Sequence, residues 1–393
     1  MKKRELKAIF ASFIMASAVL TACGTQQAAE KPKEEKQEEV KKEAASEEKA
    51  EEVDLAAAYQ EAVTELDKAK EDKEVDFDKV TELYTKNLQS LVQKRDTEVE
   101  AQHDQHITAA LQAGKDGSMN PVVVRQIFDK LMQKVFYTTI KHEFTEVAEN
   151  WGKQDVVKEE IEEAKEYYAI IKSTVEKRDA AYGTNMVSVI DGGFAEMEKA
   201  VEAEDQLGFQ LGKQVVDKTL MKTFYLATGA LPNGYATKAS AEAKENPEKA
   251  KIEQAEGWAF YQSISKYVTS HSPEEGAFIE GQFNLETDVT ALDPAAVNKA
   301  FIRGFAKVAL DEYAESIEAW GEDKSPITAL EGALFIDVVG EDIKGIIGEQ
   351  AYQALTEKAQ KYLEAAKTKD KAAGEPILAE IQTTLQSVID QAK

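Results

Sequence analysis

Apolar residues recur at three- and four-residue spacing through most of the chain. After Pro121 these positions are Val124, Ile127, Phe128, Leu131, Met132, Val135 and Phe136. The same spacing relates Val80, Leu83, Tyr84, Leu88 and Leu91, and later Ile161, Ala164, Tyr168, Ile171 and Val175. Because only a helix buries such a stripe on one side, the pattern predicts amphipathic helices.

Prolines mark the expected helix starts. Five of them follow a residue that can cap a helix, and the pairs are Asn120-Pro121, Asn246-Pro247, Ser272-Pro273, Asp293-Pro294 and Ser325-Pro326. Proline is tolerated at the first helical position, where its missing N–H is harmless. The strand-like stretches at residues 186–190 and 334–339 are short and isolated. We therefore predict an all-α protein.

The sequence also repeats itself. Residues 126–137 return as residues 214–225, with the shared pattern Gln-x-x-Asp-Lys-x-x-x-Lys-x-Phe-Tyr. Shorter matches relate Val92-x-Lys94-Arg95-Asp96 to Val175-x-Lys177-Arg178-Asp179, and a fainter third copy starts at Val297. We expect an internally duplicated helical bundle, with a first module at 55–150, a second at 151–245, and a C-terminal helical region at 246–393.

The first residues resemble a bacterial lipoprotein signal. A basic start precedes an apolar run, and Leu20-Thr21-Ala22 stands directly before Cys23, the only cysteine. The resemblance implies a signal peptide at 1–22, lipidation of Cys23, and an extracytoplasmic protein anchored to the bacterial cell membrane. Residues 23–54 are rich in Glu, Lys, Ala and Gln without an aromatic residue, which favours a disordered tether.

Composition and charge exclude several functions. The chain of 393 residues has a formal net charge of −25, which repels a nucleic-acid backbone. A phosphate-binding glycine loop, a Ser/His/Asp order and a Cys/His nucleophile set are not recognisable. The sequence therefore gives no support for an enzyme.

Histidines and carboxylates suggest a metal site in the first module. On a helical wheel His142 and Glu146 fall on the apolar stripe, with Glu143 beside them. The preceding helix offers Glu100-x-x-His103 and His106. A mixed carboxylate and imidazole site suits iron, manganese or zinc. The alternative is that each histidine is an ordinary hydrogen-bonded core residue. A zinc peptidase is disfavoured, because Glu146 stands where His-Glu-x-x-His needs its second histidine.

Two repeated arginines form a second candidate group. Arg95 and Arg178 lie near the apolar faces of their helices. We expect them to pair with the repeated Asp129 and Asp217 and so fix how the hairpins dock. The alternative is that they bind an anion, as in a receptor for organic solutes.

The body resembles the secreted iron-assimilation proteins of green algae and their bacterial relatives. The resemblance covers roughly residues 76–320 and rests on the duplicated motif, on Lys141-His142-Glu143-Phe144 and on Glu256-Gly257-Trp258-Ala259-Phe260-Tyr261. The imelysin-like iron lipoproteins match less well, since their His-x-x-Glu motif would need Glu at Thr145. The resemblance implies a protein that concentrates iron near a transporter.

Together these features predict a lipid-anchored, non-enzymatic binding protein for iron or a similar divalent metal. Its expected partners are the membrane, through the anchor, and a metal transporter. The main alternative is a scaffold or protein-interaction lipoprotein of the cell envelope, in which the polar interior is purely structural.

Overall fold

The computed structural model describes residues 54–393, and these are almost entirely helical, with no β-strand among them. The predicted signal peptide, Cys23 and the predicted tether up to residue 53 lie outside the described residues. The longer helices of the first half are α2 (Leu55–Asp67), α3 (Phe77–Leu83), α4 (Gln89–Val99), α5 (His103–Lys115), α6 (Pro121–Glu149), α7 (Gln154–Tyr182), α8 (Met186–Glu202) and α9 (Gln206–Thr228). Those of the second half are α10 (Tyr235–Glu242), α11 (Pro247–Tyr261), α12 (Ser265–His271), α13 (Pro273–Phe283), α14 (Pro294–Glu318), α15 (Lys324–Val338), α16 (Gly340–Ile347), α17 (Glu349–Thr368) and α18 (Lys371–Gln391).

The proline signals locate most helix starts correctly. Pro121, Pro247, Pro273 and Pro294 are the first residues of α6, α11, α13 and α14. The fifth pair, Ser325-Pro326, does not mark the first residue of a helix, because α15 already begins at Lys324, two residues before Pro326. The strand-like stretch 186–190 lies within α8, and the stretch 334–339 covers the end of α15 and its C-cap Val339, which confirms the all-α prediction.

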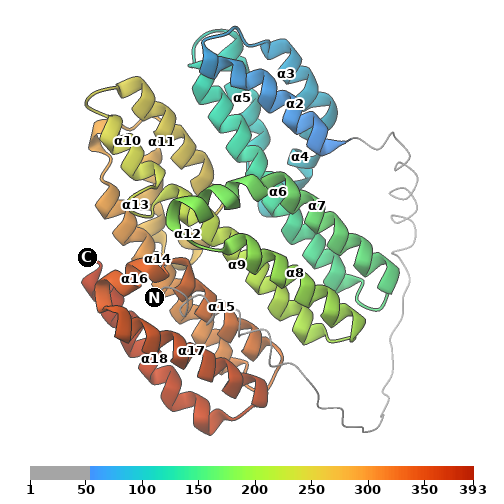
Figure 1. Ribbon diagram of the computed structural model, residues 1–393, viewed down its shortest axis with the longest axis vertical. Helices are drawn as coiled ribbons and strands as arrows, with labels where there is room; N and C mark the ends of the chain where they lie inside the picture. Colours follow the sequence, from blue (N-terminus) through green and yellow to red (C-terminus); the bar gives the residue numbers. More distant parts are fainter. Residues whose placement is uncertain (1–53) are drawn as a thin grey trace.

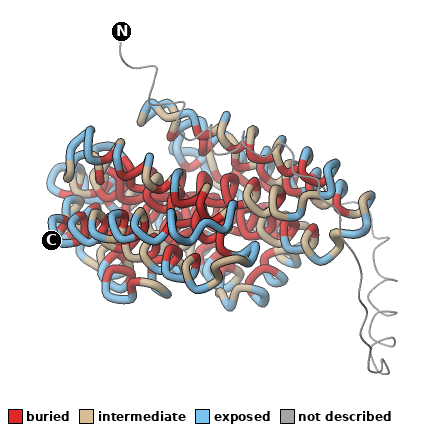
Figure 2. Tube along the Cα trace, turned by 90° about the horizontal axis from the view of Figure 1, so that it is seen from below, coloured by how far each residue is buried: buried red, intermediate tan, exposed pale blue. Residues whose placement is uncertain are grey.

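Helices α6 and α9, which carry the two copies of the repeat, lie at the centre of the bundle (Figure 1). Helix α6 packs along α7, α5, α11 and α2, and α9 packs along α8, α15 and α11. Buried residues run through the middle of the molecule and exposed ones cover its outside (Figure 2). One continuous hydrophobic cluster extends from α2 to α18, so the repeats share a core.

The central position of α6 and α9 makes their repeated polar residues buried. Asp129 and Lys130 are 3% and 7% exposed, and Asp217 and Lys218 are 4% and 2% exposed. Buried charges are costly unless they are paired, so these residues need partners from neighbouring helices. None of the described helices is long and apolar enough to cross a membrane.

Candidate functional site

The three histidines of the predicted metal site have separate surroundings. His103 is buried at the start of α5, and its Nδ1 lies 2.5 Å from a carboxylate oxygen of Asp96 on α4. His106 is exposed and meets the ring of Trp258 edge-on, with 5.3 Å between the ring centroids. Partial burial of its ring lowers the pKa of His106.

The other predicted ligands lie closer to the surface than the helical wheel indicated. The side chain of His142 is 30% exposed, and its Nδ1 lies 3.3 Å from the Glu98 carboxylate. Its Nε2 is 3.9 Å from Glu146, whose side chain is 35% exposed. Glu100 is exposed and ends α4 in the left-handed backbone region, with φ 54°.

The structure therefore does not assemble the predicted site of imidazole and carboxylate ligands. His103, buried and paired with Asp96, fits the alternative of a hydrogen-bonded core histidine, whereas His142 is partly exposed beside Glu98. Among the described residues, the group of three potential ligands that does converge consists of Glu143, Glu160 and Glu163, whose carboxylate oxygens lie within 4.8 Å of one another. Only Glu143 was predicted.

This glutamate cluster joins two long helices. Glu143 is a buried residue of α6, while Glu160 and Glu163 stand one helical turn apart on α7 and are progressively more exposed. Burial, a hydrogen bond with Glu160 and the charge of Glu163 raise the pKa of Glu143 to about 9, and the Arg95 guanidinium only partly opposes this. Near neutral pH the cluster thus holds a proton between two of its carboxylates, as closely spaced like charges require.

The prediction that the two repeated arginines pair with Asp129 and Asp217 is wrong. Arg95 pairs with Glu98 on its own helix, with 3.1 Å between Nη1 and the carboxylate, and its Nε has no hydrogen-bond partner among the described residues. Arg178 lies over the ring of Tyr235, 5.7 Å from the ring centroid. A helical wheel gives the face on which a side chain lies, but it does not identify the helix that packs there.

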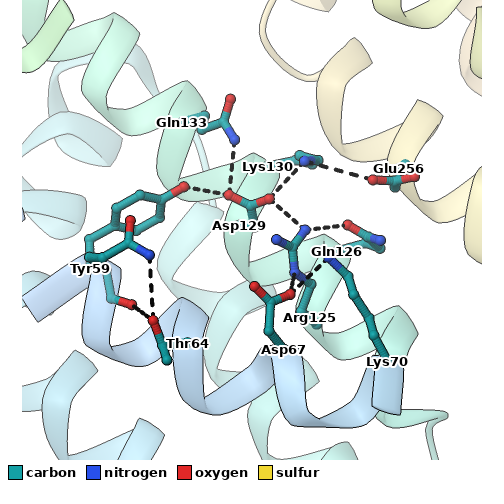
Figure 3. Close-up of polar contacts among 11 residues, drawn as sticks. Tyr59, Thr64, Asp67, Lys70, Arg125, Gln126, Asp129, Lys130, Gln133 and Glu256 are labelled. Atoms are coloured by element: carbon teal, nitrogen blue, oxygen red, sulfur yellow. Dashed lines mark hydrogen bonds and ion pairs between the residues drawn. The ribbon is translucent and has the colours of Figure 1, made fainter. Parts of the chain in front are cut away.

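The buried Asp129 is instead the centre of a dense polar network (Figure 3). It accepts hydrogen bonds from Arg125 and Lys130 at 2.7 Å each, from Gln133 at 2.9 Å and from the hydroxyl of Tyr59. Burial alone would raise the pKa of Asp129, but the charges of Lys130 and Arg125 hold it well below its usual range.

The buried Asp217 repeats this arrangement. It accepts hydrogen bonds from the Tyr137 hydroxyl at 2.5 Å and from Lys218 at 2.7 Å, and Lys141 lies 3.7 Å away. In both copies the lysine also reaches a glutamate on another helix. Lys130 lies 3.7 Å from Glu256 of α11, and Lys218 lies 3.1 Å from Glu331 of α15. The repeated Asp-Lys pair of the motif was the signal for these networks.

Comparisons with known proteins do not assign a family. Neither a protein-family model, nor a curated protein, nor a solved structure matches the chain significantly.

Proposed function

We propose that the protein is a lipid-anchored, non-enzymatic binding protein for iron or a similar divalent metal outside the cytoplasm. Its anchor is Cys23, and the metal is passed to a transporter in the same membrane. The observation that carries the proposal is the convergence of Glu143, Glu160 and Glu163 from α6 and α7. These residues replace the histidines as the proposed ligands.

Electrostatics favours a cation at this cluster. The raised pKa of Glu143 reflects burial first and then the neighbouring carboxylates, and either a proton or a metal ion relieves the repulsion among these carboxylates. Carboxylate oxygens are suitable ligands for Mn²⁺ and Fe²⁺. Since the ligands must be deprotonated, metal binding at neutral pH releases the proton that Glu143 holds.

The overall charge supports capture of cations. A chain with a net charge of −25 raises the local concentration of positive ions near its surface. This attraction is unselective, so preference for one metal has to come from the cluster.

Calorimetric titration of the purified protein with Fe²⁺ (without oxygen) and with Mn²⁺ tests the proposal. We expect binding with proton release, and we expect the double variant Glu143→Gln/Glu160→Gln to lose it. Replacement of His103, His106 and His142 by Ala should leave the affinity unchanged. A matched control is Glu312→Gln, because Glu312 is another buried carboxyl with a raised pKa but lies on α14. Equal affinity of the wild type and the double variant contradicts the assignment.

A scaffold of the cell envelope is the second candidate function. It is favoured by the networks at Asp129 and Asp217, which tie helices from different hairpins together without a ligand. A scaffold predicts that divalent metals leave the melting temperature unchanged. It also predicts that crosslinking in intact cells joins the helical surface to an envelope protein.

A further inference from the structure

Several lysines gather around the rings of Tyr137 on α6 and Tyr267 on α12. Lys134 Nζ lies 5.3 Å from the ring centroid of Tyr137, and Lys141 Nζ lies 5.6 Å from the centroids of both rings. Lys134, Tyr137 and Lys141 are three and four residues apart, so they share one face of α6. Lys266 directly precedes Tyr267 on α12, and its charge acts on Lys134. The Nζ of Lys266 donates to the Val99 carbonyl at the end of α4.

The buried carboxylate that these lysines contact is shared, because Asp217 pairs with Lys218 at 2.7 Å and lies 3.7 Å from Lys141. Lys213 and Lys218 also act on Asp217. The facing carboxylates are Asp217, Glu331 and Asp96. Asp96 is already paired with His103, and Glu312 beside Glu331 has a pKa raised to about 8, so it is mostly protonated at pH 7.

The internal repeat shows that Lys134 lacks a partner which its counterpart has. Lys222 occupies the equivalent position on α9 and forms an ion pair of 2.9 Å with Asp337 on α15. No carboxylate of the described residues forms an ion pair with Lys134, whose Nζ instead lies 5.3 Å from the ring centroid of Tyr137. Both lysines follow the Asp-Lys pair of the motif by the same interval, so the difference arises from the surrounding helices.

Burial makes the missing partner costly. Burial and the charges of Lys141 and Lys266 lower the pKa of Lys134 to about 7, although Asp217 and Asp96 act in the opposite direction. The group is nevertheless open to solvent, because the side chain of Lys141 is 37% exposed and Lys266 is an exposed residue. A ligand from solution can therefore reach it.

We propose that Lys134, Lys141 and Lys266 bind a multivalent oxyanion, such as a phosphate or a polycarboxylate. Lysine ammonium groups bind such oxygens as point charges without requiring a planar partner. The bound anion supplies the negative charge that Asp337 supplies to Lys222, and it restores the proton of Lys134. This site is independent of the proposed metal cluster.

Titration calorimetry of the purified protein with inorganic phosphate and with citrate tests the site. At pH 7.5 we expect binding with proton uptake, which is measured by repeating the titration in two buffers with different ionisation enthalpies. Affinity should fall as the pH rises above 7, because Lys134 loses its charge. Phosphate binding alone identifies a phosphate site, and citrate binding alone identifies a carboxylate site.

Two substitutions on equivalent positions of the repeat separate the site from general charge effects. Lys134→Met keeps the apolar stem and should weaken anion binding about tenfold or more. Lys222→Met removes the same charge from the other copy and should bind the anion like the wild type. If Lys134→Met fails to fold, the more exposed Lys141→Gln and Lys266→Gln replace it, and each should weaken binding several-fold.

The proposal is overturned if neither anion binds the wild-type protein at millimolar concentration. It is also overturned if the variants at Lys134, Lys141 and Lys266 bind as well as the wild type, or if Lys222→Met weakens binding as much as they do.

Discussion

The hydroxyl of Tyr137 donates a 2.5 Å hydrogen bond to the carboxylate of Asp217, and this bond joins the two copies of the repeat. Tyr137 ends the motif in α6, whereas Asp217 lies within the motif in α9. Two further hydrogen bonds from a tyrosine hydroxyl to an aspartate join neighbouring helices in the same way. Tyr59 of α2 donates to Asp129, and Tyr225, the counterpart of Tyr137, donates to Asp342 of α16 at 2.6 Å. The three bonds thus join α2 to α6, α6 to α9, and α9 to α16.

Loss of the Tyr137 hydroxyl should destabilise the protein. Tyr137→Phe keeps the ring in the core but removes one of the two close donors to a fully buried carboxylate. Hydrogen bonds to charged groups contribute about 2 kcal/mol, so we expect the unfolding free energy to fall by about that amount. Urea unfolding followed by circular dichroism measures it.

Tyr313→Phe is the matched control for this substitution. Tyr313 is equally buried, but its hydroxyl has no hydrogen-bond partner among residues 54–393. Its removal should therefore leave the unfolding free energy unchanged or raise it slightly. Equal losses in the two variants would show that the bond between Tyr137 and Asp217 has no special role.

The ion pair between Lys218 and Asp217 should be worth far more than a surface pair. Both side chains are almost completely buried, at 2% and 4% exposure. Lys218→Met leaves Asp217 and Glu331 without their shared cation, and breaking a buried pair in this way costs about 3 kcal/mol. Lys115→Met breaks an exposed pair with Asp78 and should cost less than about 1 kcal/mol. Comparable effects in urea unfolding would contradict the proposed importance of the buried networks.

The sequence alone predicted the fold class and most helix starts, because periodicity and capping are local properties. The repeat likewise located the Asp-Lys pairs. Neither signal identifies which helices face one another. Arg125 was missed as a partner of Asp129 for another reason: it stands outside the repeated motif, although its spacing of four residues from Asp129 on α6 is typical of an ion pair within one helix. The second ion pair of Arg125, 2.9 Å to Asp67 of α2, does depend on the packing of α2 against α6.

The failure of the histidine prediction has a similar cause. Glu100 turns the chain sharply between α4 and α5, which brings His103 back against Asp96 and directs His106 toward α11. A left-handed residue other than glycine is rarely foreseen from sequence. The glutamates of α7 were missed because α7 is rich in acidic residues, and only the packing of α6 selects two of them.

The glycine beside Glu256 has a packing role that is open to test. A Cβ at Gly257 would lie 2.2 Å from the ring of Phe283, so this glycine allows α11 and α13 to approach closely. Gly257→Ala should lower the unfolding free energy by about 1–3 kcal/mol through overpacking. Gly192→Ala in α8 meets no atom within 4 Å and should raise it by about 0.5–1 kcal/mol, since alanine favours the helix. A gain in stability for both variants would rule out the tight contact between α11 and α13.

The glutamate cluster should make the stability of the metal-free protein fall as the pH rises. Between about pH 4.5 and 9 the folded state holds the proton of Glu143 whereas the unfolded chain has lost it, so raising the pH favours unfolding. Because solvent screens the charges at the rim of the cluster, we expect the unfolding free energy to fall by roughly 1 kcal/mol between pH 5 and pH 8.

Glu143→Gln carries no titrating proton, so its unfolding free energy should depend less on pH and should exceed that of the wild type at pH 8. Glu312→Gln removes a second carboxyl with a raised pKa, about 8, and should flatten the remaining slope independently. Urea titrations across this pH range measure both effects, and a pH slope that survives unchanged in Glu143→Gln would show that the cluster does not hold the proton.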